Sequence, residues 1–219
     1  MQRSFISSRT PVFSGLCGIL VAATLSWGCT LNKTTDTTVE SSNLTSTQLT
    51  VGAIPDQDPE KLQRLYGILA DYLSAELGVP VTYQPVTDYT AAVTAFRVGD
   101  LDLVWFGGLT GVQARLQVPA AEAIAQRDID AEFHSIFIAS AASDLAPLST
   151  VDDLTALKGK TVTFGSESST SGRLMPQYFL AESGVAFSDL KGEPGFSGSH
   201  DATLKLVEAG TYDAGALNE

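Results

Sequence analysis

A loop rich in hydroxyl groups lies at 166–171, between a segment that predicts a strand and one that predicts a helix. Backbone N–H groups at a helix N-terminus lack intrahelical partners and carry partial positive charge. Serine and threonine hydroxyls add donors that can rotate toward a ligand. The loop offers Ser166, Ser168, Ser169, Thr170 and Ser171. Together these groups predict a neutral site for a small oxyanion. The alternative is an ordinary helix N-cap made by Ser169 or Thr170.

Composition limits the class of protein that this chain can be. Its 219 residues are 44% hydrophobic and 17% charged, which is typical of an α/β protein with one large or two small domains. The formal charge of −12 argues against nucleic-acid binding, because no basic surface is available to neutralise phosphates. An anionic ligand would have to be held by local dipoles against the field of the whole protein.

The N-terminus has the pattern of an export signal. Arg3 and Arg9 precede a nearly continuous apolar run at 11–27, and Cys29 follows, so 1–29 predicts a lipoprotein signal peptide. The segment before Cys29 resembles a bacterial lipobox, although Ser26 stands where leucine is usual. A transmembrane anchor is the alternative, but the apolar run is short for a span. Residues 30–47 are rich in Thr, Ser and Asn and predict a flexible tether.

Periodicity beyond residue 47 predicts alternating strands and helices, and therefore mainly parallel sheets covered on both faces. We expect strands at 49–54, 81–86, 101–105, 120–125, 133–139, 160–164, 193–196 and 212–217, and helices at 59–77, 89–98, 109–117, 150–157, 171–183 and 199–209. The resulting division is a first α/β lobe at 48–140, a hinge crossover at 141–149 and a second α/β lobe at 150–219.

Several separated motifs resemble one known family. They are Ser169-Thr170-Ser171-Gly172 with Leu174-Met175-Pro176, Asp88-Tyr89, the run 99–107, and Ser199-His200-Asp201-Ala202 followed by 210–216. In this order they resemble the periplasmic substrate-binding components of bacterial ABC importers for phosphonate, phosphite and related oxyanions. The segment 105–115, with 125–127, looks especially like a subgroup described as selenate binders.

The resemblance implies a periplasmic binding protein fold of type II, with two α/β lobes, a hinge and a ligand held in the cleft. Family members usually continue well beyond the position of Glu219, so we expect the second lobe to be truncated. The ligand-binding positions that it implies are Ser169, Thr170 and Ser171 in the hydroxyl loop, Tyr89, Phe106 and Gly107 in the first lobe, His200 in the second lobe, and Asn218 and Glu219 at the end of the chain.

Several of these residues have other possible roles. Tyr89 could be an aromatic side chain packed on its lobe, and His200 could cap its own helix. Arg173 could neutralise the anion or point to solvent. We expect His134 to be a strand residue and Asp213 to be structural.

The resemblance implies a lipid-anchored monomer on the periplasmic side of the inner membrane that captures phosphonate, phosphite, phosphate or selenate for an ABC permease. A ligand sensor for a signalling receptor and a non-functional fragment are the alternatives. An enzyme is not expected, because Gly-x-Ser-x-Gly, phosphate-loop, dinucleotide and metal-ligand motifs are absent from the sequence. No cofactor or metal is implied.

Overall fold

The computed structural model describes residues 48–219. The expected signal peptide (1–29), its Cys29 and the expected tether (30–47) lie outside the described residues. Within 48–219, no helix is both long enough and apolar enough to cross a membrane.

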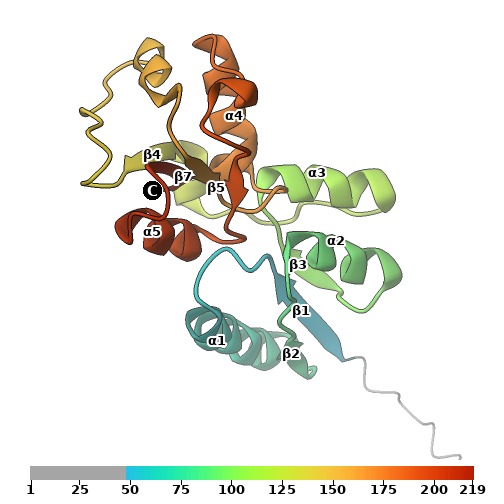
Figure 1. Ribbon diagram of the computed structural model, residues 1–219. Coiled ribbons are helices and arrows are strands. Elements are labelled where there is room, and N and C mark those ends of the chain that lie inside the picture. Colours follow the sequence, from blue (N-terminus) through green and yellow to red (C-terminus); the bar gives the residue numbers. More distant parts are fainter. Residues whose placement is uncertain (1–47) are drawn as a thin grey trace, which may run out of the picture. The chain divides into compact units, whose positions relative to one another are not determined.

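The first sheet contains three parallel strands in the order β2-β1-β3. Its elements are β1 (Leu49–Ala53), α1 (Pro59–Leu77), β2 (Val81–Tyr83), α2 (Tyr89–Val98), β3 (Leu103–Trp105) and α3 (Gly108–Gln117). Figure 1 shows α1 beside β1 and β2, while α2 and α3 lie next to each other, in agreement with their contacts. This alternation of strand and helix confirms the predicted α/β architecture of the first lobe.

The boundaries of α1 follow directly from its sequence. Asp58 caps the N-terminus by accepting hydrogen bonds from the backbone N–H groups of Glu60 and Lys61, and Pro59 occupies the first turn, where its missing N–H costs nothing. Gly78 ends the helix by donating its N–H to the carbonyl of Ser74. The expected helix at 59–77 is therefore confirmed at both ends.

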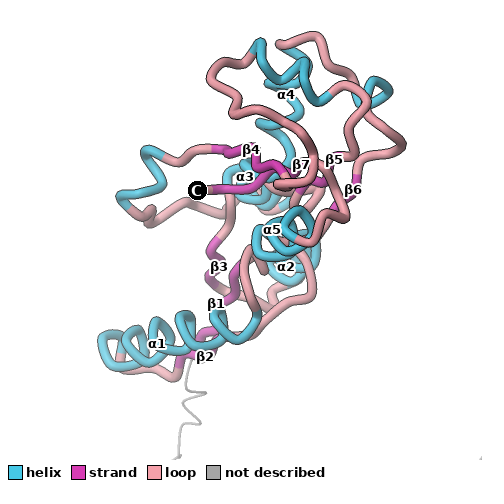
Figure 2. The backbone as a smooth tube through the Cα atoms, turned by 60° about the vertical axis from the view of Figure 1, so that its left-hand side comes forward, coloured by secondary structure: helices cyan, strands magenta, loops and turns pink. Residues whose placement is uncertain are grey.

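The second sheet has the order β4-β7-β5-β6. Its strands are β4 (Ser135–Ala139), β5 (Val162–Phe164), β6 (Gly195–Phe196) and β7 (Ala214–Asn218). The β4–β7 pair is antiparallel, whereas β5 is parallel to both β6 and β7. Figure 2 shows helices in cyan around these strands, which are in magenta. The helical elements of this part are η2 (Asp152–Leu157), η3 (Thr170–Leu174), α4 (Met175–Glu182), η4 (Phe187–Asp189) and α5 (His200–Glu208). A separate apolar core contains Val162, Phe164, Leu180 and Ala216.

Two strand predictions need correction. Residues 120–125 form no strand, because this alanine-rich segment is largely exposed and no neighbouring strand pairs with it. The strand expected at 133–139 forms as β4, but it pairs with β7 in the second sheet and does not belong to the first lobe. The pattern of residues predicts that a strand exists but does not determine which strand pairs with it.

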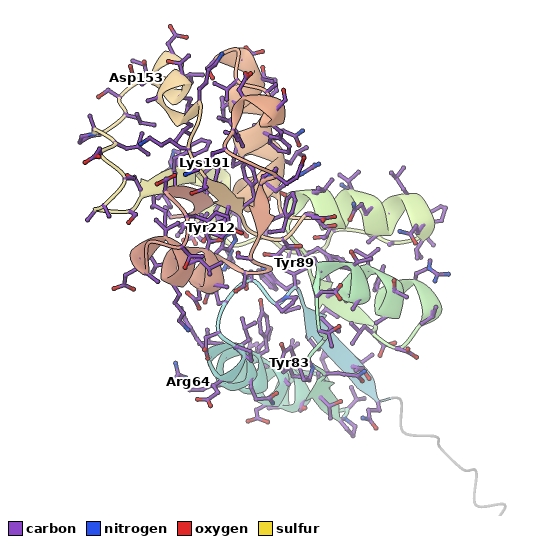
Figure 3. The ribbon with its side chains drawn as sticks, in the orientation of Figure 1. Arg64, Tyr83, Tyr89, Asp153, Lys191 and Tyr212 are labelled. Atoms are coloured by element: carbon purple, nitrogen blue, oxygen red, sulfur yellow. The ribbon has the colours of Figure 1, made fainter. Side chains whose placement is uncertain are left out.

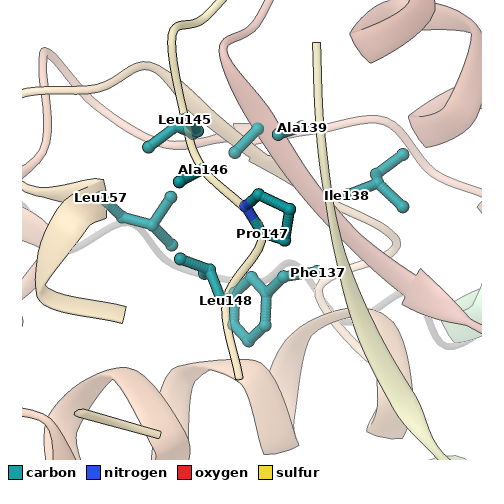
Figure 4. Close-up of a pocket in the computed structure, with 9 residues that line it drawn as sticks. Phe137, Ile138, Ala139, Leu145, Ala146, Pro147, Leu148 and Leu157 are labelled. Atoms are coloured by element: carbon teal, nitrogen blue, oxygen red, sulfur yellow. The ribbon is translucent and has the colours of Figure 1, made fainter. Parts of the chain in front are cut away.

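A cavity of about 230 Å³ lies in the second lobe, between β4 and the segment 145–148 (Figure 4). It is lined by Phe137, Ile138, Ala139, Leu145, Ala146, Pro147, Leu148, Leu157 and Ala214. None of these is a predicted site residue, and no charged side chain lines the cavity. The lining of this cavity therefore does not match the predicted oxyanion site.

Candidate oxyanion site

The hydroxyl loop leaves β5 and runs into the short helix η3. The side chain of Ser169 accepts a hydrogen bond from the backbone N–H of Gly172 (3.0 Å), so Ser169 is the N-cap of η3. The simpler interpretation of the loop is therefore correct for this one residue. Ser169 is 2% exposed and Ser171 is 4% exposed, so both residues are largely buried.

The cap leaves other donors of the loop without a partner. The backbone N–H of Ser169 donates to the carbonyl of Ser166 (2.9 Å). Within 48–219, no hydrogen bond engages the backbone N–H groups of Thr170 and Ser171 or the hydroxyl of Ser171. These unengaged donors remain available to an acceptor such as an oxyanion.

Tyr89 is the first residue of α2, which Asp88 caps by accepting from the backbone N–H of Ala91 (2.7 Å). The Tyr89 side chain is 2% exposed, and its hydroxyl is buried with no hydrogen-bond partner in the described part of the chain. Burial, and after it the charge of Asp56, raises the pKa of Tyr89, while a hydrogen-bonding approach to the Ser169 side chain, outside the geometry of a full hydrogen bond, acts to lower it. Tyr89 (labelled in Figure 3) therefore stays protonated, and its hydroxyl can donate a hydrogen bond beside the hydroxyl loop.

His200 is the first residue of α5 and is 7% exposed. Its Nδ1 accepts a hydrogen bond from the backbone N–H of Asn218 (3.3 Å), which assigns the ring proton of the neutral imidazole to Nε2. Burial lowers the pKa of His200 to about 4, although the charge of Asp201 acts in the opposite direction. At neutral pH, His200 is thus an uncharged donor.

Gly172 brings these groups together. A Cβ atom added there would lie 3.0 Å from Ser169 Oγ, 3.2 Å from His200 Cε1 and 3.3 Å from Gly165 Cα. The hydroxyl loop and the start of α5 can therefore approach closely only because residue 172 has no side chain.

Thr170 reaches the first lobe. Its Oγ1 accepts a hydrogen bond from the backbone N–H of Leu109 (2.8 Å), and a Cβ atom on Gly108 would lie 3.3 Å from the same oxygen. The N-terminus of α3 thus contacts the hydroxyl loop. We call the set of Tyr89, Ser169, Thr170, Ser171 and His200 the cradle.

The remaining predicted residues have other surroundings. Phe106 packs edge-on against Phe96, with ring centroids 5.7 Å apart, in the core of the first lobe. Gly107 is the N-cap of α3, and its carbonyl accepts from the backbone N–H of Gly111 (2.8 Å). Asn218 reaches His200 through its backbone, whereas the carboxylate of Glu219 lies 2.8 Å from Nδ1 of His134.

Two residues with open alternatives are also placed. Asp213 accepts hydrogen bonds from the backbone N–H and the hydroxyl of Thr161 (both 2.8 Å), which lower its pKa and agree with the expected structural role. The Nε atom of Arg173 is buried without a hydrogen-bond partner among residues 48–219, so this atom does not point to solvent.

Some residues at the cradle were not found from the sequence. The carbonyl of Asp56 accepts from the backbone N–H of His200 (2.9 Å), and Oδ2 of Asp201 accepts from the backbone N–H of Asp58 (2.7 Å). Burial is the main cause that raises the pKa of Asp56. An acidic residue in the first turn of α5 was a usable signal for Asp201, but a backbone group such as the N–H of Leu109 has no signature in a sequence.

In chemical terms the cradle offers uncharged donors from both lobes. Among residues 48–219, no group of three or more His, Cys, Asp or Glu side chains is placed to hold a metal ion. Helix N-termini, hydroxyls and a neutral imidazole are groups that bind small oxyanions.

Comparison with known proteins leads to one family. The family model described as "ABC transporter, phosphonate, periplasmic substrate-binding protein" matches residues 51–219. The chain is 56% identical over 172 residues to the probable ABC transporter phosphite binding protein PhnD1 of Prochlorococcus marinus, covering 78% of this chain and 58% of that protein. It is 29% identical over 177 residues to the phosphate-import protein PhnD of Mycolicibacterium smegmatis, covering 76% of this chain and 54% of that protein.

A solved structure gives the same result. The structure of PhnD1 from Prochlorococcus marinus in complex with methylphosphonate matches with a TM-score of 0.77 and 56% identity, over 78% of this chain and 63% of that chain. The chain spans 58% and 54% of the two curated relatives, or little more than half of their length. These matches show that the chain belongs to the phosphonate-binding family of ABC transporter periplasmic substrate-binding proteins, with the two-lobed α/β fold of type II periplasmic binding proteins.

Proposed function

We propose that this chain captures a small tetrahedral oxyanion in the cradle and delivers it to an ABC permease. The observation that carries the proposal is the Tyr89 hydroxyl, which is buried without a hydrogen-bond partner among residues 48–219 and lies near the side chain of Ser169. A buried donor without an acceptor costs about 1–3 kcal/mol, and a bound oxyanion would remove this cost. Hydrogen bonds to a charged acceptor are also stronger than neutral ones.

The ligand class is phosphonate, phosphite, phosphate or selenate. The names of the relatives support phosphorus oxyanions as ligands. One relative is a probable phosphite binding protein whose structure contains methylphosphonate, and the other is a phosphate-import protein. We infer that the bound anion is transported and not transformed. A lipid on Cys29, which becomes the first residue when 1–28 are removed, would hold a monomeric binding protein on the periplasmic side of the inner membrane, with 30–47 as tether.

Calorimetric titration tests the proposed function. The mature chain is titrated with methylphosphonate, phosphite, phosphate, selenate and sulfate, and we expect dissociation constants near micromolar for at least one phosphorus oxyanion, equivalent to about −8 kcal/mol. Tyr89→Phe keeps the buried ring and removes only the hydroxyl, so it should weaken binding about tenfold or more without loss of the fold.

The same titration is run on a longer chimera, because this chain spans 58% of the Prochlorococcus marinus relative. The chimera adds the part of that relative which lies outside the match. If neither folded protein binds any anion of the panel, the proposed function is wrong. If both bind, and Tyr89→Phe binds equally well, the site is not the cradle.

A further inference from the structure

The contacts between the two lobes lie beside the cradle. They are hydrogen bonds from the backbone N–H of Leu109 to Thr170 Oγ1 (2.8 Å), of His200 to the Asp56 carbonyl (2.9 Å) and of Asp58 to Asp201 Oδ2 (2.7 Å). Among these three, only the first uses a side chain of the cradle. This bond therefore offers a route by which a ligand could act on the contact between the lobes.

The bond to Thr170 is an N-cap given to α3 by the other lobe. A capping side chain accepts from the second or third N–H of its helix, and Leu109 is the second residue of α3. The helix has no cap from its own sequence, because its N-cap position is Gly107, which has no side chain. Thr170 lies 61 positions further along the chain and provides the missing acceptor.

The approach of the two elements is close enough to make this contact specific. A Cβ atom on Gly108 would lie 3.3 Å from Thr170 Oγ1 and 3.6 Å from its Cγ2. A side chain at Gly108 would therefore crowd the threonine, whereas a Cβ atom on Gly107 would lie at an ordinary contact distance of 3.9 Å from Thr170 Oγ1. The N-terminus of α3 therefore contacts the hydroxyl loop directly, with no other side chain between them.

The hydroxyl of Thr170 still has its hydrogen to give. A hydroxyl has one hydrogen and two lone pairs, and the bond from Leu109 uses a lone pair. No other hydrogen bond of this hydroxyl is found within 48–219. An oxyanion is an acceptor, so Thr170 can hold α3 through its oxygen while donating its hydrogen to the anion.

We propose that Thr170 couples oxyanion binding to the contact between the lobes by capping α3 and donating to the ligand at the same time. Donation to an anion makes the hydroxyl oxygen a better acceptor, because hydrogen bonds in a chain polarise one another. Ligand binding then strengthens the cap on α3. By linkage, the capped arrangement binds the anion more tightly to the same degree. The inference rests on the function proposed above.

A matched pair of variants isolates the donor of this bond. Leu109→Pro removes the N–H, and Leu109→Ala removes a comparable part of the side chain but keeps the N–H. Proline is tolerated in the first turn of a helix, so both variants should fold. We expect Leu109→Pro to bind methylphosphonate five- to tenfold more weakly than Leu109→Ala in calorimetry. Circular dichroism and thermal melting check the fold of both proteins.

Hydrogen exchange gives a second readout that needs no proline. In the wild-type protein, saturation with methylphosphonate should slow hydrogen exchange at the Leu109 amide. The Thr170→Ser variant should show the same protection. The Thr170→Val variant, also measured at saturation, should show none. Equal affinities of Leu109→Pro and Leu109→Ala, or no ligand-dependent protection in the wild type, would overturn the coupling. Failure of the wild type to bind any oxyanion would instead overturn the proposed function.

Discussion

Ser169 and Ser171 lie two positions apart in the same loop and use their hydroxyls differently. Ser169 accepts from the backbone N–H of Gly172 at 3.0 Å and holds the helix start, whereas the hydroxyl of Ser171 has no partner within 48–219. The oxygen of the first hydroxyl therefore holds the helix start, whereas the second hydroxyl takes no part in holding it. Their side chains are equally small, so substitutions at the two positions form a matched comparison.

Ser169→Ala should lower the free energy of unfolding by about 1 kcal/mol, because it removes an N-cap. Ser171→Ala should leave the unfolding free energy nearly unchanged and weaken methylphosphonate binding about tenfold. Urea denaturation measures the first quantity and calorimetry the second. A Ser171→Ala protein with wild-type affinity would show that this hydroxyl does not contact the anion.

The buried imidazole of His200 predicts a pH dependence of stability. Its pKa is about 4 in the folded protein against 6.5 for the free side chain, so the unfolded chain binds a proton more readily between these values. Stability therefore falls as the pH is lowered from 6.5 toward 4 and levels off below 4. The expected loss from this group is about 3 kcal/mol.

His200→Asn is the control for this pH dependence, since an asparagine oxygen can replace Nδ1 as the acceptor for the Asn218 amide. As the pH falls, the wild type should lose more unfolding free energy than His200→Asn, because the variant has no imidazole to protonate at this position. Measurements by urea denaturation at pH 7, 6, 5 and 4.5 give this difference directly. Parallel pH curves for the two proteins would contradict the assignment of a neutral, buried His200.

At the scale of elements, the helix starts could be predicted from the sequence and the partners of the strands could not. Asp58 with Pro59 marked the beginning of α1, since capping is decided by neighbours in the chain. β4 was predicted as a strand but assigned to the wrong sheet, because it pairs with β7 through contacts far apart in sequence. Similarly, the hydroxyls of the cradle were predicted, but the backbone N–H of Leu109 was not.

The close packing at the start of η3 predicts the effect of an added methyl group. In Gly172→Ala the new Cβ would meet Ser169 Oγ, His200 Cε1 and the Cα of Gly165, all at 3.3 Å or less. We expect a loss of about 1–3 kcal/mol in unfolding free energy, because a backbone neighbour cannot move aside easily. Methylphosphonate affinity should fall as well, since the loop and α5 would separate.

Gly67→Ala provides the matched control. Gly67 lies inside α1, and a Cβ atom there has no neighbour within 4 Å. The substitution should raise the unfolding free energy by about 0.5–1 kcal/mol, because alanine has the higher helix propensity. If both glycine variants changed stability in the same direction, close packing at Gly172 would not explain its effect.

At the scale of the whole molecule, charge opposes the ligand. The formal charge of −12 repels an approaching oxyanion, and the cradle is built from uncharged donors. Added salt screens this repulsion, because the Debye length falls from about 30 Å at 0.01 M to about 10 Å at 0.1 M. We therefore expect the association rate of methylphosphonate to rise severalfold over this range of sodium chloride concentration.

Stopped-flow measurement of ligand binding gives this association rate. Sodium fluoride in place of sodium chloride checks that the effect is screening and does not depend on one salt. A rate that falls as salt is added would mean that a local positive charge attracts the ligand, and Arg173, with its buried Nε, would then be the residue to substitute.

The position of β7 in the second sheet also affects how the protein is made. β7 lies between β4 and β5, yet it is the last of these strands to leave the ribosome. β4 therefore has no strand beside it during synthesis until 214–218 appear, and its open edge is available to other chains. Assembly of this sheet should therefore wait until 214–218 have been synthesised, and a factor that shields β4 until then would raise the yield of folded protein.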